Sequence, residues 1–269
     1  MSEAAISTCR VNIGDAELHV EEAGAGPVVL LVSGLGGRGA FWRGQMAPLA
    51  EHFRTITFDH RGCGSSTPGL TVENIAHMAG DVLALMDALE IERVHLVGHS
   101  TGGAIGQHLA LNAPERLSKL ILSCSWPGPD AYFTELFRHR REVLEQCGPR
   151  DYLSSGTFLA MPGAILQRQM AGAGSNLEER LAAFPGLEVE LSRIAAVMGH
   201  DLRARLLEIC LPTLCIGAAD DQITPTGFTE EMAAAIPGAA LEILPRGGHF
   251  CPMAETAAYN ARIIPFLTS

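Results

Sequence analysis

Residues 94–102 read Val-His-Leu-Val-Gly-His-Ser-Thr-Gly. An apolar, strand-like run is followed at once by the pattern G-x-S-x-G, and a predicted helix then extends to residue 112. At a strand-to-helix junction the two glycines leave space for a tight, strained turn that exposes the hydroxyl of Ser100. The N-terminus of the following helix stabilises negative charge that develops beside it. This stretch therefore predicts a nucleophilic serine.

Strands and helices alternate on both sides of this segment. The expected strands cover residues 28–32, 55–58, 94–97, 120–122, 212–217 and 240–244, after a hairpin over residues 9–22. The expected helices here cover residues 72–89, 102–112, 226–236 and 254–267. Such alternation is typical of βαβ units. We therefore expect an α/β fold with a mostly parallel central sheet and helices on both faces.

The alternation stops between residues 126 and 205. This segment has helical stretches near 133–147, 150–160, 177–183 and 188–198, without a strand-like run. The simplest organisation is an α/β core of residues 1–125 and 206–269, interrupted by a helical cap insert of residues 126–205. The insert holds nine arginines and ten acidic residues, a net charge of −1, whereas the whole chain carries −11. The acidity therefore lies on the core, and a small anionic substrate is compatible with it.

The composition excludes several classes of function. With 19 Lys+Arg against 30 Asp+Glu, the chain is unsuited to gripping nucleic acid or an anionic membrane. The longest apolar run, residues 28–32, is far shorter than the roughly 20 residues of a membrane span. No secretory signal is evident, and the seven cysteines lack a C-x-x-C pair. We expect a cytoplasmic protein with reduced thiols, and the sequence leaves open whether it forms a homodimer.

A serine hydroxyl needs an adjacent base to become a good nucleophile. The best candidate is His249, which lies in the glycine loop 245–250 between the last expected strand and the last expected helix. His99 abuts Ser100, but we expect its side chain to point to the other side of the turn.

The base in turn needs an acid that fixes its tautomer. Asp220 and Asp221 both follow the strand 212–217. We favour Asp221, which stands four residues before Pro225, and the pair remains open at this point.

The order Ser100, Asp221, His249 is the one expected of α/β-hydrolases, and the sequence resembles that superfamily over essentially its whole length. Residues 33–37, Ser-Gly-Leu-Gly-Gly, stand where the family often has H-G-x-G-G, and residues 59–66 are similar to its D-x-R-G-x-G-x-S loop. The resemblance implies an oxyanion hole formed by the backbone N–H groups of Leu35 and Thr101. Ser33 departs from the family's histidine, which affects substrate fit more than the hole, because the donors are backbone groups.

A serine nucleophile excludes haloalkane dehalogenases and epoxide hydrolases of this fold, which place an aspartate there. What remains is hydrolysis of an ester, lactone, thioester, amide or carbamate, or of a C–C bond. Residues 33–37, 136–162, 219–221 and 247–249 resemble the 3-oxoadipate enol-lactonase group and, more closely, the aminoacrylate (carbamate) hydrolases. The resemblance implies a small-molecule substrate. A ligand-sensing α/β-hydrolase with slow turnover, whose insert recruits a partner, is the alternative from another class.

Three other side chains have two interpretations each. Trp126 begins the insert and either lines the substrate pocket or packs in the core. Arg138 belongs to a basic cluster on one helix that either binds substrate or faces solvent. Arg61 either holds loops together or clamps a carboxylate.

Neither a metal nor a cofactor is expected. The chain has no H-E-x-x-H pattern and no paired C-x-x-C. A dinucleotide-binding fingerprint is also missing from the first βα unit.

Overall fold

The computed structural model describes residues 6–173 and 176–269, whose strands form one sheet in the order β1-β2-β4-β3-β5-β6-β7-β8. The strands are β1 Ser7–Asn12, β2 Glu17–Ala23, β3 Val28–Val32, β4 Arg54–Phe58, β5 Val94–His99, β6 Leu117–Ser123, β7 Thr213–Ala218 and β8 Ala240–Leu244. β2 runs antiparallel to β1 and to β4, whereas all other neighbours are parallel. The predicted fold class, an α/β protein with a mostly parallel sheet, is confirmed.

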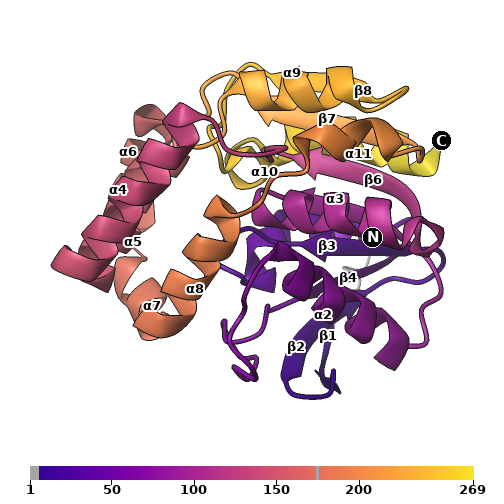
Figure 1. The fold of residues 1–269 in the computed structure, drawn as a ribbon, viewed down its shortest axis with the longest axis horizontal. Helices are drawn as coiled ribbons and strands as arrows, with labels where there is room; N and C mark the ends of the chain where they lie inside the picture. The colour runs from indigo at the N-terminus through magenta and orange to yellow at the C-terminus, as the bar shows by residue number, and fades with distance from the viewer. Residues whose placement is uncertain (1–5, 174–175) are drawn as a thin grey trace.

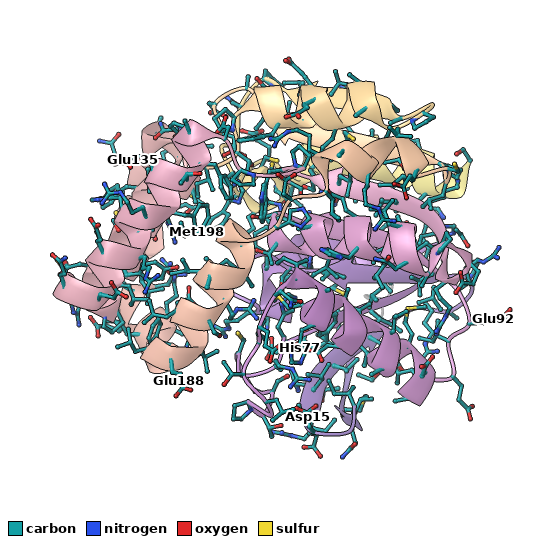
Figure 2. All side chains as sticks on the ribbon, in the orientation of Figure 1. Asp15, His77, Glu92, Glu135, Glu188 and Met198 are labelled. Atoms are coloured by element: carbon teal, nitrogen blue, oxygen red, sulfur yellow. The ribbon has the colours of Figure 1, made fainter. Side chains whose placement is uncertain are left out.

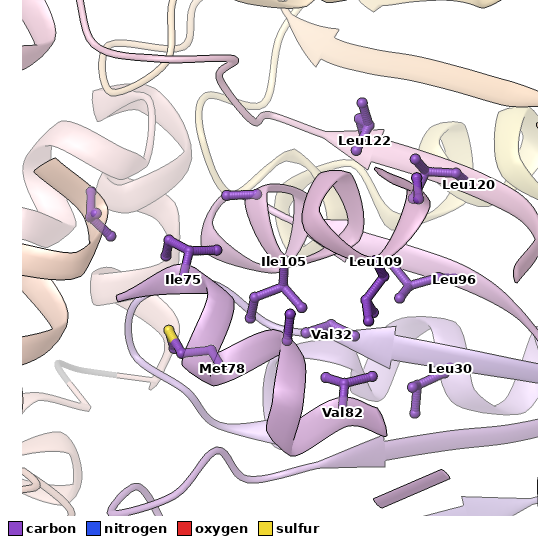
Figure 3. Close-up of a cluster of buried hydrophobic side chains, with 14 of the residues drawn as sticks. Leu30, Val32, Ile75, Met78, Val82, Leu96, Ile105, Leu109, Leu120 and Leu122 are labelled. Atoms are coloured by element: carbon purple, nitrogen blue, oxygen red, sulfur yellow. The ribbon is translucent and has the colours of Figure 1, made fainter. Parts of the chain in front are cut away.

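Both faces of the central strands are buried, which explains their unbroken apolar runs. In β3, Leu30 and Val32 join a core cluster with α2 (Ile75–Ala88), α3 (Thr101–Asn112) and α9 (Thr226–Ala235). Val29 and Leu31 join a second cluster with α1 (Arg43–Ala50) and α11 (Thr256–Thr268) on the opposite face. Figure 3 shows part of the first cluster, with Ile105 and Leu109 of α3 between Leu120 and Leu122 of β6 and Leu30 and Val32 of β3.

The segment between β6 and β7 forms a separate group of helices. They are α4 Ala131–Cys147, α5 Pro149–Ala160, α6 Gly163–Ala173, α7 Leu177–Ala182 and α8 Leu187–Met198. These helices, which we call the cap, gather to one side of the sheet, and β6 and β7 point toward them (Figure 1). In α/β sheets, ligands bind outside the carboxyl ends of the strands, so the cap faces the place where a substrate is expected.

The remaining helical elements are short. They are the 3-10 helices η1 Gly39–Trp42, η2 Pro114–Arg116 and η3 Arg203–Glu208, and α10 Cys251–Ala254. Within residues 6–173 and 176–269, the structure contains no helix with the length and apolar character that crossing a membrane requires.

Helix α1 was not expected from the sequence, because its eight residues include Gly44 and Pro48. Pro48 cannot donate the helical hydrogen bond to the carbonyl four residues earlier, which belongs to Gly44. Asn260 of α11 replaces that donor, since its Nδ2 lies 3.1 Å from the Gly44 oxygen. Asn260 Oδ1 also accepts a bond of 3.2 Å from Gln45 Nε2. A side chain more than 200 positions away therefore completes α1.

Replacing Asn260 by Ala should lower the free energy of unfolding by about 1–3 kcal/mol, because it leaves the Gly44 carbonyl without a donor inside the protein. The matched control is Asn112→Ala, which removes an exposed side chain that bonds only its own helix, at His108. Urea denaturation of both variants measures the difference. Equal, small effects would contradict this role of Asn260.

Candidate active site

Ser100 occupies a strained turn between β5 and α3. Its φ is +53°, a region that side-chain-bearing residues rarely adopt. A Cβ on Gly98 would lie 2.2 Å from the Gly102 oxygen, and a Cβ on Gly102 would lie 2.1 Å from the Val32 oxygen. Only glycine fits at both positions, as the sequence pattern predicts. The helix consequently starts directly against β3.

Hydrogen bonds from the neighbouring strand hold this turn. The backbone N–H of Ser100 donates to the Ser123 oxygen over 2.8 Å, and Ser125 Oγ donates to the Ser100 oxygen over 3.0 Å. Both partners come from β6 or the loop after it. Such over-determination is what lets a strained residue persist.

His249 and Asp221 are hydrogen-bonded to each other. His249 Nδ1 lies 2.9 Å from Asp221 Oδ2, and both side chains are buried. Asp221 Oδ1 accepts the backbone N–H groups of Ile223 (2.8 Å) and Thr224 (3.0 Å). The Thr224 hydroxyl lies 2.9 Å from Asp221 Oδ2. With Nδ1 engaged in this way, Nε2 is the ring nitrogen left for proton transfer.

The two adjacent aspartates have different partners. Burial alone would raise the pKa of Asp221, but the charge and hydrogen bond of His249 and the two backbone donors outweigh it, so the pKa lies below its ordinary value. Asp220 Oδ1 instead accepts the Gly248 N–H over 2.8 Å. Asp221 therefore contacts the imidazole, and Asp220 holds the loop that carries it.

His99 lies elsewhere than expected. Its ring centroid is 4.9 Å from that of His249 and 4.6 Å from that of Phe41, on which it stacks. It also lines the same cavity as Ser100, so the expectation that it points away from the serine is wrong. Burial and the charge of His249 hold the pKa of His99 well below its usual value, and the ring is neutral. The neutral ring of His99 therefore lies beside that of His249.

Ser100 and His249 both line one cavity of about 800 Å³ between the core and the cap. Much of its lining is apolar and comes from cap helices, including Phe137, Leu153 and Phe158. The described residues show no hydrogen bond between Ser100 Oγ and His249; such contacts often tighten only with substrate bound.

The loop after β3 passes directly beside the serine. A Cβ on Gly34 would lie 3.2 Å from Ser100 Cβ, which brings the neighbouring Leu35 to the same place. Thr101 is the first residue of α3, where N–H groups have no acceptor within the helix. Of the two residues implied as oxyanion donors, Thr101 therefore follows Ser100 in the chain, and Leu35 lies in the loop beside it.

Arg193 of α8 joins the cap to this loop, and sequence reasoning missed it. Its Nε donates to the Leu35 oxygen over 3.0 Å, and one Nη lies 3.1 Å from His60 Nδ1. Burial and the charge of Arg193 hold the pKa of His60 well below its usual value, so His60 is a neutral acceptor. Ser33 Oγ lies 3.4 Å from the other nitrogen of His60. No local motif marks Arg193, because its partners lie about 160 positions away.

Cys124 completes a group whose ligand atoms, with those of Asp221 and His249, lie within 4.8 Å of one another. Asp221 and His249 already bond each other. A hydrogen bond with Cys251 and burial raise the pKa of the Cys124 thiol well above its usual value. Metals bind the thiolate form of cysteine, and the raised pKa keeps Cys124 a thiol. Cys124, Asp221 and His249 are therefore poorly suited to bind a metal.

Trp126 and Arg138 do not line the cavity in the described part of the chain. Trp126 is buried and stacks on Phe133, with ring centroids 4.8 Å apart. Arg138 is exposed and forms ion pairs with Glu135 and Glu142; Glu135 points outward from the cap (Figure 2). These positions do not support the substrate-binding role expected of Trp126 and Arg138. Trp126 packs in the core, and Arg138 lies on a face of the helix that is exposed to solvent.

Arg61 is also structural. It is buried between Asp81 and Asp15, at 2.5 and 2.6 Å. The two carboxylates occupy its guanidinium, which excludes the substrate-clamp interpretation.

The sequence profile of the alpha/beta hydrolase fold matches residues 27–255. The chain belongs to the α/β-hydrolase family. A protein of Caulobacter vibrioides (strain NA1000 / CB15N), named "Putative carbamate hydrolase RutD", is 37% identical over 252 residues, which cover 93% of this chain and 94% of that protein.

Solved structures agree with this assignment. A hydrolase from Pseudomonas aeruginosa PA01 superimposes on this α/β-hydrolase with a TM-score of 0.85 at 31% identity, over 98% of each chain. The enol-lactonase from Burkholderia xenovorans LB400 has a TM-score of 0.86 at 26% identity, and the match covers 98% of this chain and 100% of that chain.

Asp221→Asn should lower kcat for p-nitrophenyl acetate by about 10⁴-fold, because an amide can stabilise the wrong imidazole tautomer. Asp220→Asn should retain kcat within about threefold, because Asn still offers an oxygen to the Gly248 N–H. Stopped assays of the two purified variants compare them directly. A larger loss in Asp220→Asn would reassign the acid.

Arg193→Met should lower kcat by about 10-fold to 100-fold with little change in KM, because the loop that carries Leu35 loses its donor from the cap. Arg203→Met is the matched control. Arg203 also donates to a backbone carbonyl, that of Gly128 over 2.8 Å, but its partners Gly128, Pro129 and Glu231 lie outside the loop that carries Leu35. A fall in stability with unchanged kcat in both variants would contradict a positioning role for Arg193.

Proposed function

We propose that this α/β-hydrolase cleaves small ester, lactone, or carbamate and amide substrates through a covalent acyl-enzyme on Ser100. One observation carries the proposal. Ser100 stands on a strained turn and faces the same cavity as His249, whose Nδ1 is held 2.9 Å from the buried Asp221. This is the arrangement that a serine hydroxyl requires to be activated at neutral pH.

In the first half of the reaction, His249 Nε2 takes the proton of Ser100 Oγ as the oxygen bonds to the substrate carbonyl carbon. Asp221 stabilises the imidazolium that forms. The negative charge moves to the carbonyl oxygen, where the N–H groups of Leu35 and Thr101 receive it. The intermediate then collapses, the bond to the leaving group breaks, and that group leaves with the proton from His249.

In the second half, a water molecule attacks the acyl carbon and gives one proton to His249. Collapse of this second intermediate breaks the bond to Ser100 Oγ, which takes the proton back. The product is a carboxylic acid, or a carbamic acid where the substrate is a carbamate. The neutral ring of His99 limits proton loss from His249 to its neighbour.

The cavity supports a substrate class wider than the carbamate group alone. Its volume of about 800 Å³ falls in the range typical of sites for drug-sized ligands, roughly 300–1,000 Å³. The names of the relatives, "Putative carbamate hydrolase RutD" and an enol-lactonase, support hydrolysis at both carbamate and lactone carbonyls. We expect the apolar cap lining to favour substrates with a hydrocarbon part next to the scissile carbonyl.

Ser100→Ala should reduce turnover of p-nitrophenyl acetate and of a p-nitrophenyl N-alkyl carbamate by at least about 10³-fold, because only the oxyanion donors and binding remain. Mass spectrometry of wild type quenched during carbamate turnover should show the carbamoyl adduct on Ser100. Asp221→Asn serves as a control in which the serine is retained and the adduct forms slowly.

Two results would overturn the proposal. Full activity of Ser100→Ala would point to water attack assisted by His249 without an acyl-enzyme. Tight binding of such esters by the wild type with negligible turnover would favour the ligand-sensing alternative.

A further inference from the structure

The lining of the cavity carries more arginines than carboxylates. In a chain with a net charge of −11, the cavity lining contains four arginines and two glutamates; these are Arg38, Arg43, Arg140, Arg180, Glu179 and Glu190. An excess of cations inside a partly apolar cavity is costly unless an anion compensates it.

Arg140 of α4 has guanidinium nitrogens without a partner. Its guanidinium carbon lies 4.8 Å from the ring centroid of Tyr152. Nε and Nη1 are buried and form no hydrogen bond with the described residues. A Cβ on Gly156 would lie 3.0 Å from Nη1, so the glycine leaves room for the guanidinium. Buried donors without partners are rare in proteins, and these belong to a side chain that lines the cavity.

Arg180 of α7 lines the same cavity, and its acceptors among the described residues are neutral. It donates to Thr157 Oγ1 and, over 3.2 Å, to the Leu153 oxygen. Burial, and then the charges of Arg140 and Arg38, hold its pKa below the usual value.

Neither glutamate of the cavity forms an ion pair with Arg140 or Arg180 in the described part of the chain. Glu190 accepts the Tyr152 hydroxyl over 2.6 Å, and burial raises the pKa of Glu190. Glu179 lies 3.9 Å from Arg38. Among residues 6–173 and 176–269, neither Arg140 nor Arg180 is within 4.0 Å of a carboxylate oxygen.

We propose that Arg140 and Arg180 form a carboxylate-binding subsite in the cap, so that the substrate carries an acid group in addition to the bond that Ser100 cleaves. A guanidinium presents planar, paired donors that match a carboxylate. The carboxylate would supply the missing acceptors of Arg140 and the missing counter-charge of Arg180. The link to a scissile bond rests on the proposed function, whereas anion binding does not.

The first experiment measures binding without catalysis. Glutarate, a small dicarboxylate, is titrated calorimetrically into the Ser100→Ala variant, with its neutral diamide as the comparison ligand. We expect glutarate to bind and the diamide to bind at least about tenfold more weakly, since a charge-assisted bond is lost at each guanidinium. Adding Arg140→Met or Arg180→Met should weaken glutarate binding by about tenfold or more.

The matched control is Arg138→Met on the same helix as Arg140. Arg138 is exposed, has its own glutamate partners and does not line the cavity within the described residues. Its loss should leave glutarate binding unchanged. Equal affinity for glutarate and the diamide, or equal effects of the three substitutions, would overturn the subsite.

Kinetics then separate the subsite from the hydrolase. Wild type should have a kcat/KM at least about tenfold higher for the p-nitrophenyl hemiester of glutaric acid than for p-nitrophenyl pentanoate. Arg180→Met should abolish that preference while the rate with the neutral ester stays within about twofold. Arg180→Lys, which keeps the charge, should restore part of it, and this variant guards against a folding defect in Arg180→Met.

The two proposals fail differently. Hydrolysis of both esters at one rate, with no effect of glutarate, contradicts the subsite and leaves the serine hydrolase intact. Arginine-dependent binding of glutarate by an enzyme that cleaves neither ester contradicts the hydrolase assignment and leaves the subsite intact.

Discussion

The close approach of α3 to the sheet at Gly98 and Gly102 is the constraint on which the site depends. Two backbone oxygens lie where any larger residue would place its Cβ. The helix therefore begins against the C-terminal end of β3, and Ser100 adopts a positive φ. The strain is local, and the bond from the Ser100 N–H to the Ser123 oxygen contributes to holding it. Ser100, the proposed nucleophile, thus has a fixed backbone position before any substrate arrives.

A second constraint couples the cap to the chemistry of the core. Arg193 is a fully buried cation, and its hydrogen-bond acceptors among the described residues are the neutral oxygens of Leu35 and Gly34 and the neutral ring of His60. Because burial and Arg193 itself keep His60 unprotonated, that acceptor persists over the usual pH range. The cap therefore does more than enclose the substrate: it fixes the loop beside the serine.

Local patterns predicted what depends on local backbone geometry. The strained turn at Ser100 was predicted from the five residues 98–102. The apolar runs predicted β3 and β8 at their observed bounds. Features that depend on distant partners were missed: α1 needs Asn260 to complete it, and the direction of the His99 ring follows from its stacking on Phe41. The sequence of α4 did not distinguish Arg138 from Arg140, because both are arginines on one helix. Among the described residues, Arg140 lines the cavity and Arg138 does not.

The contact between α1 and α11 also affects how the chain folds during translation. Trp42, Met46 and Leu49 belong to the same buried cluster as Tyr259 and Ile263. Because α11 follows all eight strands in the sequence, the apolar face that it covers stays exposed until residues 256–268 have been made. Exposed apolar surface of this kind favours aggregation.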